Sequence, residues 1–191
     1  AAQFRPLLFY KDPDRSQETE IITQGQIIAE IVDQCEAAQD GDIFSNIFIT
    51  APTGSGKSIL FQIPAIYLAE KYNLVTIVVS PLIALMNDQV DQLQRERGIS
   101  IAACINSSMS IEERSDVIDQ IHAGKKSLLY LAPELLLTTH LQSFLGGRQV
   151  GMVVIDEAHT VTSGGRDFRS DYWFLGGFLK QTATDGLSFP V

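Results

Sequence analysis

The segment A-P-T-G-S-G-K-S at residues 51–58 constrains the fold of this chain more than any other feature of its sequence. An apolar run at residues 46–50 precedes it, and a helical pattern begins at Lys57. A strand, a glycine-rich turn and a helix in this order present backbone N–H groups and a helix N-terminus to anionic phosphates. The segment predicts a phosphate-binding loop in an α/β domain. The alternative is a Gly/Ser turn that precedes Lys-Ser by chance.

The residue types in this loop suit a nucleoside triphosphate and its Mg²⁺ ion. Gly54 and Gly56 allow backbone conformations that a Cβ atom would hinder. The Lys57 ammonium can reach the outer phosphates, and the Ser58 hydroxyl can ligate Mg²⁺. We therefore expect the nucleotide to be bound by Thr53, Gly54, Ser55, Gly56, Lys57 and Ser58.

Short apolar runs alternate with longer amphipathic segments along most of the chain, a pattern typical of βαβ units around a parallel sheet. The runs are rich in Ile, Val, Leu and Phe, as strands buried on both faces should be. They cover residues 46–50, 74–80, 99–105, 127–131 and 150–155. The predicted fold is an α/β domain whose mostly parallel sheet has helices on both faces.

Helical spacing of apolar residues predicts helices at residues 17–38, 57–72 and 82–97, and a further one that starts at Ser110 and ends at Gly124. Ser110 and Glu113 have the spacing of a capping box. Pro64 should bend or interrupt the helix that contains it. We divide the chain into an N-terminal helical segment, residues 1–45, and a nucleotide-binding lobe, residues 46–191.

The net charge of -9 has the wrong sign for a protein that holds nucleic acid by neutralising phosphates alone. A strand can still be held by backbone amides and a few local Lys or Arg side chains. The absence of a long apolar stretch and of a basic start before an apolar run predicts no membrane span, no secretion signal and a cytoplasmic location. Cys35 and Cys104 lack metal-binding spacing, so we expect two ordinary reduced cysteines.

The run at residues 153–155 ends in two carboxylates, Asp156 and Glu157, followed by Ala158 and His159. Ligands of α/β sheets bind at the ends of strands such as this one. One carboxylate can hold Mg²⁺ while the next orients or deprotonates the attacking water. Alone, the pair would read as the solvated start of a helix; together with the upstream loop, it predicts the other half of one nucleotide site.

The order of these motifs resembles the first RecA-like lobe of superfamily 2 helicases, and most closely the RecQ-like, DEAH-box group. The resemblance runs from about Thr23 to Val191. Residues 51–58 are similar to motif I, V-V-S-P-L-I-A-L-M-N-D-Q-V at 78–90 to motif Ia, Y-L-A-P-E at 130–134 to motif Ib, and D-E-A-H at 156–159 to motif II. The resemblance implies an ATP-dependent DNA helicase or translocase with ATP and Mg²⁺ as cofactors, in which Lys57, Asp156, Glu157 and His159 are catalytic and Ser58 and Asp156 hold the metal.

In such families the residues that follow the second and fourth of the predicted strands contact the sugar-phosphate of a single strand. The resemblance implies this role for Ser80, Pro81 and Asn87, with Ala132, Pro133 and Glu134 nearby. We interpret Ile83, Leu85 and Met86 as helix core.

RecQ-like proteins also have an upstream Gln that recognises adenine. Gln24 matches it best and Gln26 is the fallback. The aromatic-Arg-Pro-Gly that usually comes before this Gln is replaced by E-I-I-T at residues 20–23.

After the D-E-A-H box, the family has an aromatic-rich loop that senses single-stranded DNA, and residues 162–172 match it. The Asp-Phe-Arg core of the loop is kept. Gly164 takes the place of the family's Trp, while Trp173 lies further on and can pack a helix. Phe168 can stack on a base, and Arg166 or Arg169 can meet a phosphate. The alternative is a solvated loop with a core aromatic.

The apolar and polar alternation that begins at residue 187 stops at Val191, so we expect the sequence to be a fragment. The resemblance implies that the intact protein is longer and contains a second RecA-like lobe with an arginine finger. Two other functions compete with the helicase. One is an ATP-gated nucleic-acid-binding scaffold that does not unwind, and the other is a different P-loop enzyme, such as a small-molecule kinase. RNA in place of DNA stays open, because no feature here reads a 2′-hydroxyl.

Overall fold

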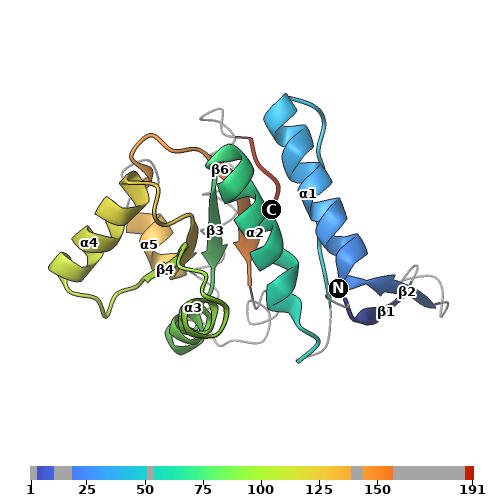
Figure 1. Ribbon diagram of the computed structural model, residues 1–191, viewed down its shortest axis with the longest axis horizontal. Helices are drawn as coiled ribbons and strands as arrows, with labels where there is room; N and C mark the ends of the chain where they lie inside the picture. The colour runs from blue at the N-terminus through green and yellow to red at the C-terminus, as the bar shows by residue number, and fades with distance from the viewer. Residues whose placement is uncertain (1–3, 11–18, 51–53, 139–143, 157–187) are drawn as a thin grey trace.

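The computed structural model describes residues 4–10, 19–50, 54–138, 144–156 and 188–191. At its centre is a four-stranded sheet in the order β4-β5-β3-β6 (Figure 1). Its strands are β3 (Val75–Val79), β4 (Ala102–Ile105), β5 (Leu128–Leu131) and β6 (Val150–Ile155). Every neighbouring pair in this sheet is parallel. The predicted α/β class with a parallel sheet is confirmed.

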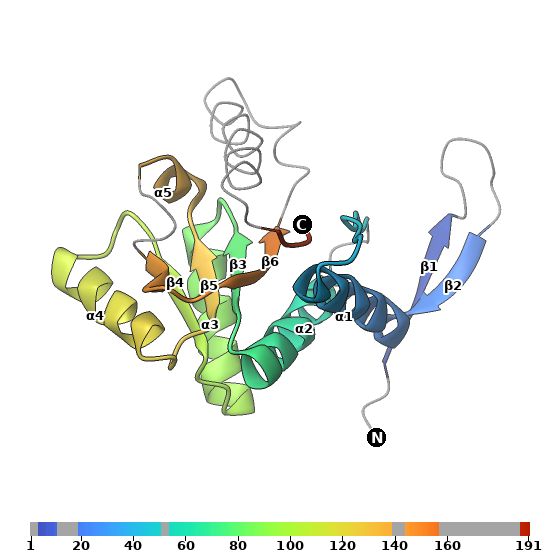
Figure 2. The same ribbon diagram turned by 90° about the horizontal axis from the view of Figure 1, so that it is seen from above.

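The central strands are buried on both faces, which explains their mostly apolar sequence, Thr76 of β3 excepted. All residues of β3 and of β5 are buried. Helices α2 (Lys57–Tyr72) and α3 (Ile83–Arg97) pack on one face of the sheet, and α5 (Pro133–Thr138) lies on the other (Figure 2). The crossover connections between parallel strands place helices on the faces of the sheet, so both faces are buried.

The helices that follow the phosphate loop lie where the sequence predicts them. Helix α2 has the predicted bounds, and α3 begins one residue later than predicted. Helix α4 (Ile111–His122) starts with the predicted capping box: the Ser110 hydroxyl accepts from the Glu113 N–H, and the Glu113 carboxylate accepts from the Ser110 N–H. Gly124 follows the end of α4 with a φ of +74°.

Of the two effects predicted for Pro64, a bend or an interruption of α2, the interruption is wrong. The helix is continuous through this position, and Pro64 is buried. A proline in a helix removes one N–H donor and strains one turn. The burial of Leu60, Phe61, Ala65 and Leu68 around it offsets that cost.

The N-terminal helix starts later than the prediction of residue 17. Helix α1 is Gln24–Asp40, and the residues before it form the strand β2 (Thr19–Thr23), which pairs antiparallel with β1 (Pro6–Tyr10). The β-branched run from Ile21 to Thr23 favours a strand. Thr23 then stops it by capping α1 in a capping box with Gln26.

The predicted strand at residues 46–50 is not formed as a regular strand. The Ile47 N–H donates to the Val191 carbonyl at 3.1 Å, and the Val153 N–H of β6 donates to the Pro190 carbonyl at 3.0 Å. Residues 188–191 therefore lie between β6 and the segment that leads into the phosphate loop. Among the described residues, the backbone bond from Ile47 to Val191 ties residues 46–50 to residues 188–191, and it does not extend into the ladder of a regular strand.

A polar cluster joins α1 to α2. The same Glu36 carboxylate oxygen accepts from Lys71 Nζ at 2.7 Å, the Tyr67 hydroxyl at 2.5 Å and the Tyr72 hydroxyl at 2.8 Å. These hydrogen bonds, that from Lys71 first, lower the pKa of Glu36 to about 2. The Lys71 ammonium also lies about 5 Å from the centres of both tyrosine rings, 5.1 and 4.9 Å.

The apolar face of α1 belongs to the same hydrophobic core as the sheet, through Ile27, Ile31 and Cys35. Cys35 and Cys104 are both free thiols. Burial raises the pKa of Cys35 to about 12, which makes it an unreactive core residue. In the part of the chain that the structure describes, no helix has both the length and the apolar character needed to cross a bilayer.

Candidate nucleotide-binding site

The phosphate loop depends on two glycines with left-handed backbone. Gly54 has a φ of +79° and Gly56, the N-cap of α2, has a φ of +81°. Other residues reach this conformation at a cost of roughly 1–2 kcal/mol. A Cβ atom on Gly56 would also lie 2.7 Å from the side-chain nitrogen of Gln24. The sequence places glycine where the chain turns into α2, and Thr53 lies outside the described residues.

The start of α2 is built to receive an anion. Gly56 supplies no side-chain cap, so the N–H groups of the first turn lack the usual cap acceptor. The Ser55 hydroxyl is buried and has no hydrogen-bond partner among the described residues. Lys57 is the first residue of this helix. A helix start without a side-chain cap, the positive end of the helix dipole, the Ser55 hydroxyl and a lysine together fit the phosphates of a nucleotide.

Gln24 contacts the loop directly. It is the first residue of α1 and only 5% exposed. Its side-chain oxygen accepts from the Arg5 N–H at 3.0 Å, and its nitrogen donates to the carbonyls of Ser55 at 3.2 Å and Gly56 at 3.3 Å. The fallback, Gln26, has its side chain in the capping box with Thr23. The structure thus brings Gln24 to the loop, while its contact with adenine stays a prediction.

The predicted metal ligand Ser58 is held by a residue that the sequence analysis did not assign to the site. Gln89, on α3, donates from Nε2 to the Ser58 hydroxyl oxygen at 2.8 Å. Its other amide atom, Oε1, accepts from Gln62 at 2.8 Å and from the Tyr130 hydroxyl at 3.1 Å. The sequence feature that could have indicated Gln89 is the polar end of the A-L-M-N-D-Q run at residues 84–89. We interpreted this run as a contact with a nucleic-acid strand, made by Asn87 alone.

Asp156 lies directly after β6, at the carboxyl edge of the sheet. Its N–H donates to the Val79 carbonyl at 3.0 Å, which fixes it beside the end of β3. Burial raises the pKa of the Tyr130 hydroxyl to about 12, and the charge of Asp156 adds to this rise. Asp156 therefore lies close enough to act electrostatically on Tyr130, whose hydroxyl donates to Gln89. Glu157 and His159 lie outside the described residues.

The donor set suits Mg²⁺ bound mainly through nucleotide and water. Among the described residues, no group of three or more His, Cys, Asp or Glu side chains is arranged to hold a metal ion. Mg²⁺ in nucleotide sites usually needs only one or two protein oxygens, because phosphates and water supply the rest. Ser58 and Asp156 are of the kind that this coordination requires.

The residues predicted to contact a nucleic-acid strand lie after two neighbouring strands of the sheet. Ser80 follows β3 and is 1% exposed, and its hydroxyl has no partner in the described part of the chain. Pro81 is half-buried and Asn87, on α3, is exposed. Ala132 follows β5, and Pro133 and Glu134 begin α5. Met86, interpreted as helix core, is buried at 1% exposure, which confirms that interpretation for this residue. Arg166, Phe168 and Arg169 lie outside the described residues.

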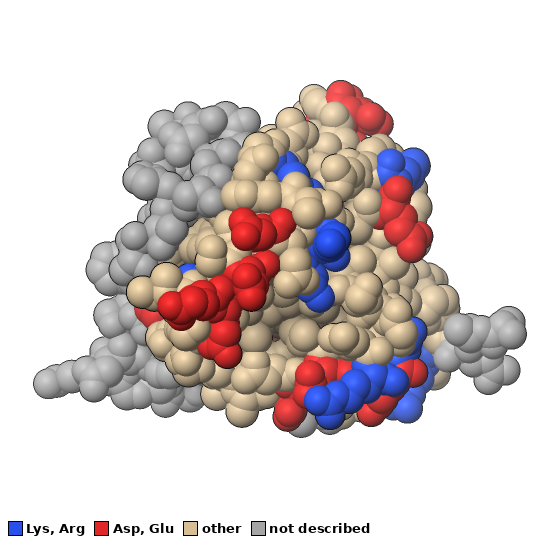
Figure 3. Space-filling model, turned by 60° about the vertical axis from the view of Figure 1, so that its left-hand side comes forward, with Lys and Arg blue, Asp and Glu red and all other residues tan. Residues whose placement is uncertain are grey.

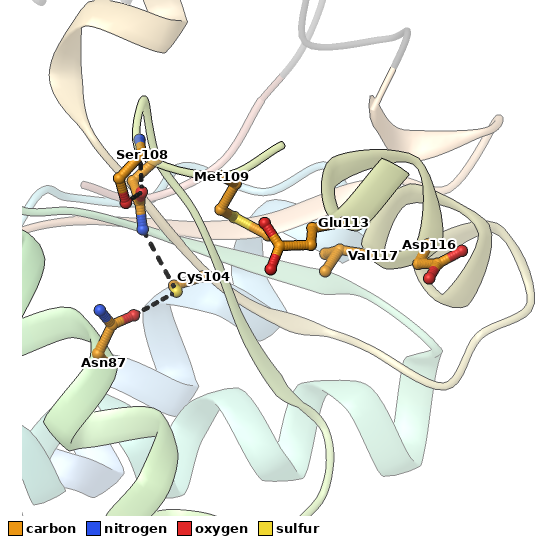
Figure 4. A pocket seen from close by; sticks show the side chains of 8 residues that line it. Asn87, Cys104, Ser108, Met109, Glu113, Asp116 and Val117 are labelled. Atoms are coloured by element: carbon orange, nitrogen blue, oxygen red, sulfur yellow. Dashed lines mark hydrogen bonds between the residues drawn. The ribbon is translucent and has the colours of Figure 1, made fainter. Parts of the chain in front are cut away.

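Asn87 lines a pocket of about 440 Å³ between α3, β4 and α4 (Figure 4). Its side-chain oxygen accepts from the Cys104 thiol at 2.8 Å. Glu113 and Asp116 line the same pocket. Acidic side chains gather on one part of the surface in Figure 3. Two further acidic residues of α4, Glu112 and Asp119, are exposed. The carboxylates of Glu113 and Asp116 would repel a phosphate from this pocket.

The fold and the loop define a class of protein: a P-loop nucleotide-binding domain with a RecA-like sheet. A solved structure described as a hypothetical ATP-dependent RNA helicase from Sulfolobus tokodaii aligns with a TM-score of 0.55 and 20% identity. The alignment covers 86% of this chain and 44% of that one. At this identity the likeness concerns the fold alone.

The chain belongs to the DEAD/DEAH box helicase family, whose model matches residues 23–185. It is RecQ-like. The ATP-dependent DNA helicase RecQ of Haemophilus influenzae is 41% identical over 72% of this chain, which spans 21% of that relative. RecQ of Bacillus subtilis is 46% identical over 63% of this chain and 20% of its own length. The ATP-dependent helicase SGS1 of Saccharomyces cerevisiae is 33% identical over 71% of this chain and 10% of its own length. The predicted family and lobe are confirmed.

Proposed function

We propose that this chain is the ATP-binding lobe of an ATP-dependent DNA helicase or translocase. The observation that carries the proposal is the loop of residues 54–58, held by Gln24 on one side and Gln89 on the other, in a chain of the DEAD/DEAH box family. The RecQ relatives are described as ATP-dependent DNA helicases. Their names support ATP as the nucleotide and DNA as the strand.

Each side chain of the site has a separate task in the proposed mechanism. Thr53, Ser55 and the backbone N–H groups at the start of α2 bind the phosphates, and Lys57 neutralises the outer ones. Ser58 and Asp156 would hold Mg²⁺, which when bound offsets charge on the phosphates. Glu157 orients and deprotonates the attacking water, and His159 links the site to the strand.

The proposed strand path crosses the carboxyl edge of the sheet. Ser80, Pro81 and Asn87 contact the sugar-phosphate, and Phe168, Arg166 and Arg169 add stacking and charge. The Ser80 hydroxyl must rotate out of its buried position to take part. The acidic face over α4 lies outside this path, because it would repel the phosphates.

We infer that a second RecA-like lobe of the same full-length protein completes the catalytic site and supplies an arginine finger. Such a residue can raise hydrolysis by about 10³ to 10⁵. We therefore expect residues 1–191 alone to bind nucleotide weakly and to hydrolyse it poorly. We also propose, on the sequence grounds given above, a cytoplasmic location.

The test is strand displacement by the full-length protein with ATP and Mg²⁺, using Glu157→Gln as the matched inactive variant. Unwinding that needs ATP and disappears in the variant supports the proposal. Strand binding that responds to ATP without unwinding would instead identify a scaffold, which the acidic surface favours. A parallel assay with an RNA strand of the same sequence decides between the two nucleic acids.

A further inference from the structure

The Gln89 side chain is held by hydrogen bonds on both sides of its amide. Oε1 accepts from two donors, Gln62 Nε2 and the Tyr130 hydroxyl, while Nε2 donates to Ser58. Gln62 Nε2 also donates to the Tyr130 hydroxyl at 3.2 Å, so the three side chains close a ring. Gln62 and Tyr130 are buried, at 6% and 1% exposure. The orientation of the Gln89 amide is therefore fixed, with its nitrogen toward Ser58.

This orientation fixes the use of the Ser58 hydroxyl. A serine hydroxyl has one proton to donate and two lone pairs to accept with. Gln89 occupies one lone pair at 2.8 Å, and the other described residues leave the second lone pair and the proton for a ligand. A metal ion needs a lone pair of this oxygen. Without Gln89, the hydroxyl would be free to rotate among several partners.

Gln89 also connects Ser58 to the helix that carries the proposed strand contacts. Asn87 and Gln89 are two residues apart on α3, so their side chains point to different sides of the helix. Asn87 is exposed and bonds Cys104, whereas Gln89 points to α2 and bonds Ser58. The turn that starts α3 contains Ser80 and Pro81. A shift of α3 when a nucleic-acid strand binds would thus move Gln89, the hydrogen-bond partner of Ser58.

We propose that Gln89 is a positioning residue that holds the Ser58 hydroxyl for Mg²⁺ and couples α3 to the nucleotide site. Gln62 and Tyr130 orient its amide. The inference rests on the proposed function, because it assigns Ser58 to the metal of a bound nucleotide.

The first test measures the affinity of the full-length protein for a fluorescent, non-hydrolysable ATP analogue as Mg²⁺ is titrated, and again in EDTA. Gln89→Ala should raise the Mg²⁺ concentration needed for half-maximal tightening by roughly tenfold, the loss expected for one well-formed hydrogen bond. Affinity in EDTA should stay within about twofold. Tyr130→Phe, which removes one of the two donors to Gln89, should shift the Mg²⁺ dependence in the same direction and by less.

The matched control is Gln94→Ala, an exposed glutamine on the same helix. It should leave the Mg²⁺ dependence unchanged. A Gln89→Ala variant with unchanged Mg²⁺ dependence, or with equal losses in Mg²⁺ and in EDTA, would overturn the inference, since either result would leave no specific link to the metal. Thermal unfolding of each variant confirms that the compared proteins are folded.

The second test uses hydrolysis. In the full-length protein, Gln89→Ala should reduce the stimulation of ATP hydrolysis by single-stranded DNA more than it reduces the basal rate. Equal reductions would remove the coupling role. If the unchanged protein does not bind the nucleotide analogue in Mg²⁺ at all, the proposed function fails. If the unchanged protein binds it and Gln89→Ala has the same Mg²⁺ dependence of binding, only the inference about Gln89 fails.

Discussion

The side-chain nitrogen of Gln24 lies 3.2 Å from the carbonyl oxygen of Ser55, so the first residue of α1 is bonded to the phosphate loop 31 positions further along the chain. Its oxygen is occupied by the Arg5 N–H. The N-terminal segment thus shapes the loop through one buried amide. This contact makes α1 part of the nucleotide site rather than an appendage of it.

Replacement of Gln24 should weaken nucleotide binding more than it weakens the fold. Gln24→Ala removes both loop contacts, and we expect a loss of roughly tenfold in ATP-analogue affinity, measured by fluorescence titration. The matched variant is Gln26→Ala. It loses its half of the α1 capping box, worth about 0.5–1 kcal/mol of stability, but should keep the affinity. If Gln26→Ala lost nucleotide affinity and Gln24→Ala kept it, the nucleotide-recognition role would belong to Gln26.

The two loop glycines should respond differently to alanine. Both pay a penalty of roughly 1–2 kcal/mol for positive φ. At Gly56 the new Cβ meets the Gln24 nitrogen at 2.7 Å, whereas at Gly54 no atom of the described residues lies within 4 Å of it. Gly56→Ala should therefore lose more nucleotide affinity than Gly54→Ala.

The same pair can be tested in a Gln24→Ala background. There the clash at residue 56 is gone, so Gly54→Ala and Gly56→Ala should have similar effects on affinity. A persistent difference between them would mean that the Gly56 effect arises from the phosphate contacts alone.

The Glu36 cluster should make stability depend on acid pH. Because the folded state lowers the pKa of Glu36 from 4.5 to about 2, its stabilisation is complete above about pH 4.5 and is lost as the pH falls toward 2. Glu36→Gln should therefore be less stable than the unchanged protein at pH 7, with the gap closing between pH 4.5 and 2. Urea unfolding across this range measures the gap. Glu70→Gln, which removes an exposed carboxylate of α2, is the control for the loss of one negative charge.

Arg148 should matter for stability and not for nucleotide binding. Its guanidinium donates to the carbonyls of Ile121, Lys126 and Asn73, to the Asn73 side chain and to the Ser127 hydroxyl. These partners join the ends of α2 and α4 to the start of β5. Arg148→Met should cost about 2–4 kcal/mol in urea unfolding, because it removes several charge-assisted hydrogen bonds.

The control for this prediction is Arg95→Met, which breaks an exposed ion pair with Asp91 of 3.3 Å. It should cost less than about 1 kcal/mol. If Arg148→Met lowered nucleotide affinity at temperatures where the protein stays folded, the separation between this edge of the sheet and the site would be wrong.

The sequence predicted the central fold well because its signals there are local. Glycines, a lysine and a helical pattern come together around Lys57, and the strands β3, β5 and β6 are mostly apolar runs. The capping box of Ser110 is equally local, since it needs two residues three positions apart. Such features can be recognised from neighbouring residues alone, because they do not depend on tertiary contacts.

The errors came where tertiary contacts decide. The hairpin of β1 and β2 depends on cross-strand pairs such as Leu7 with Ile22, which periodicity within one segment does not reveal. Gln89 reaches Ser58 across 31 positions of sequence, so no local pattern marks it as part of the site. Pro64 sits in a helix whose surrounding core offsets its cost.

The position of residues 188–191 has a consequence for the order of events during synthesis. A ribosome makes the phosphate loop early and this segment more than a hundred residues later, yet the backbone bond from Ile47 runs to Val191. Until then, the approach to the loop lacks this partner. We therefore expect the segment that leads into the phosphate loop to gain this backbone contact only after synthesis has passed residue 191, later than the α1–α2 pair and β3 are made.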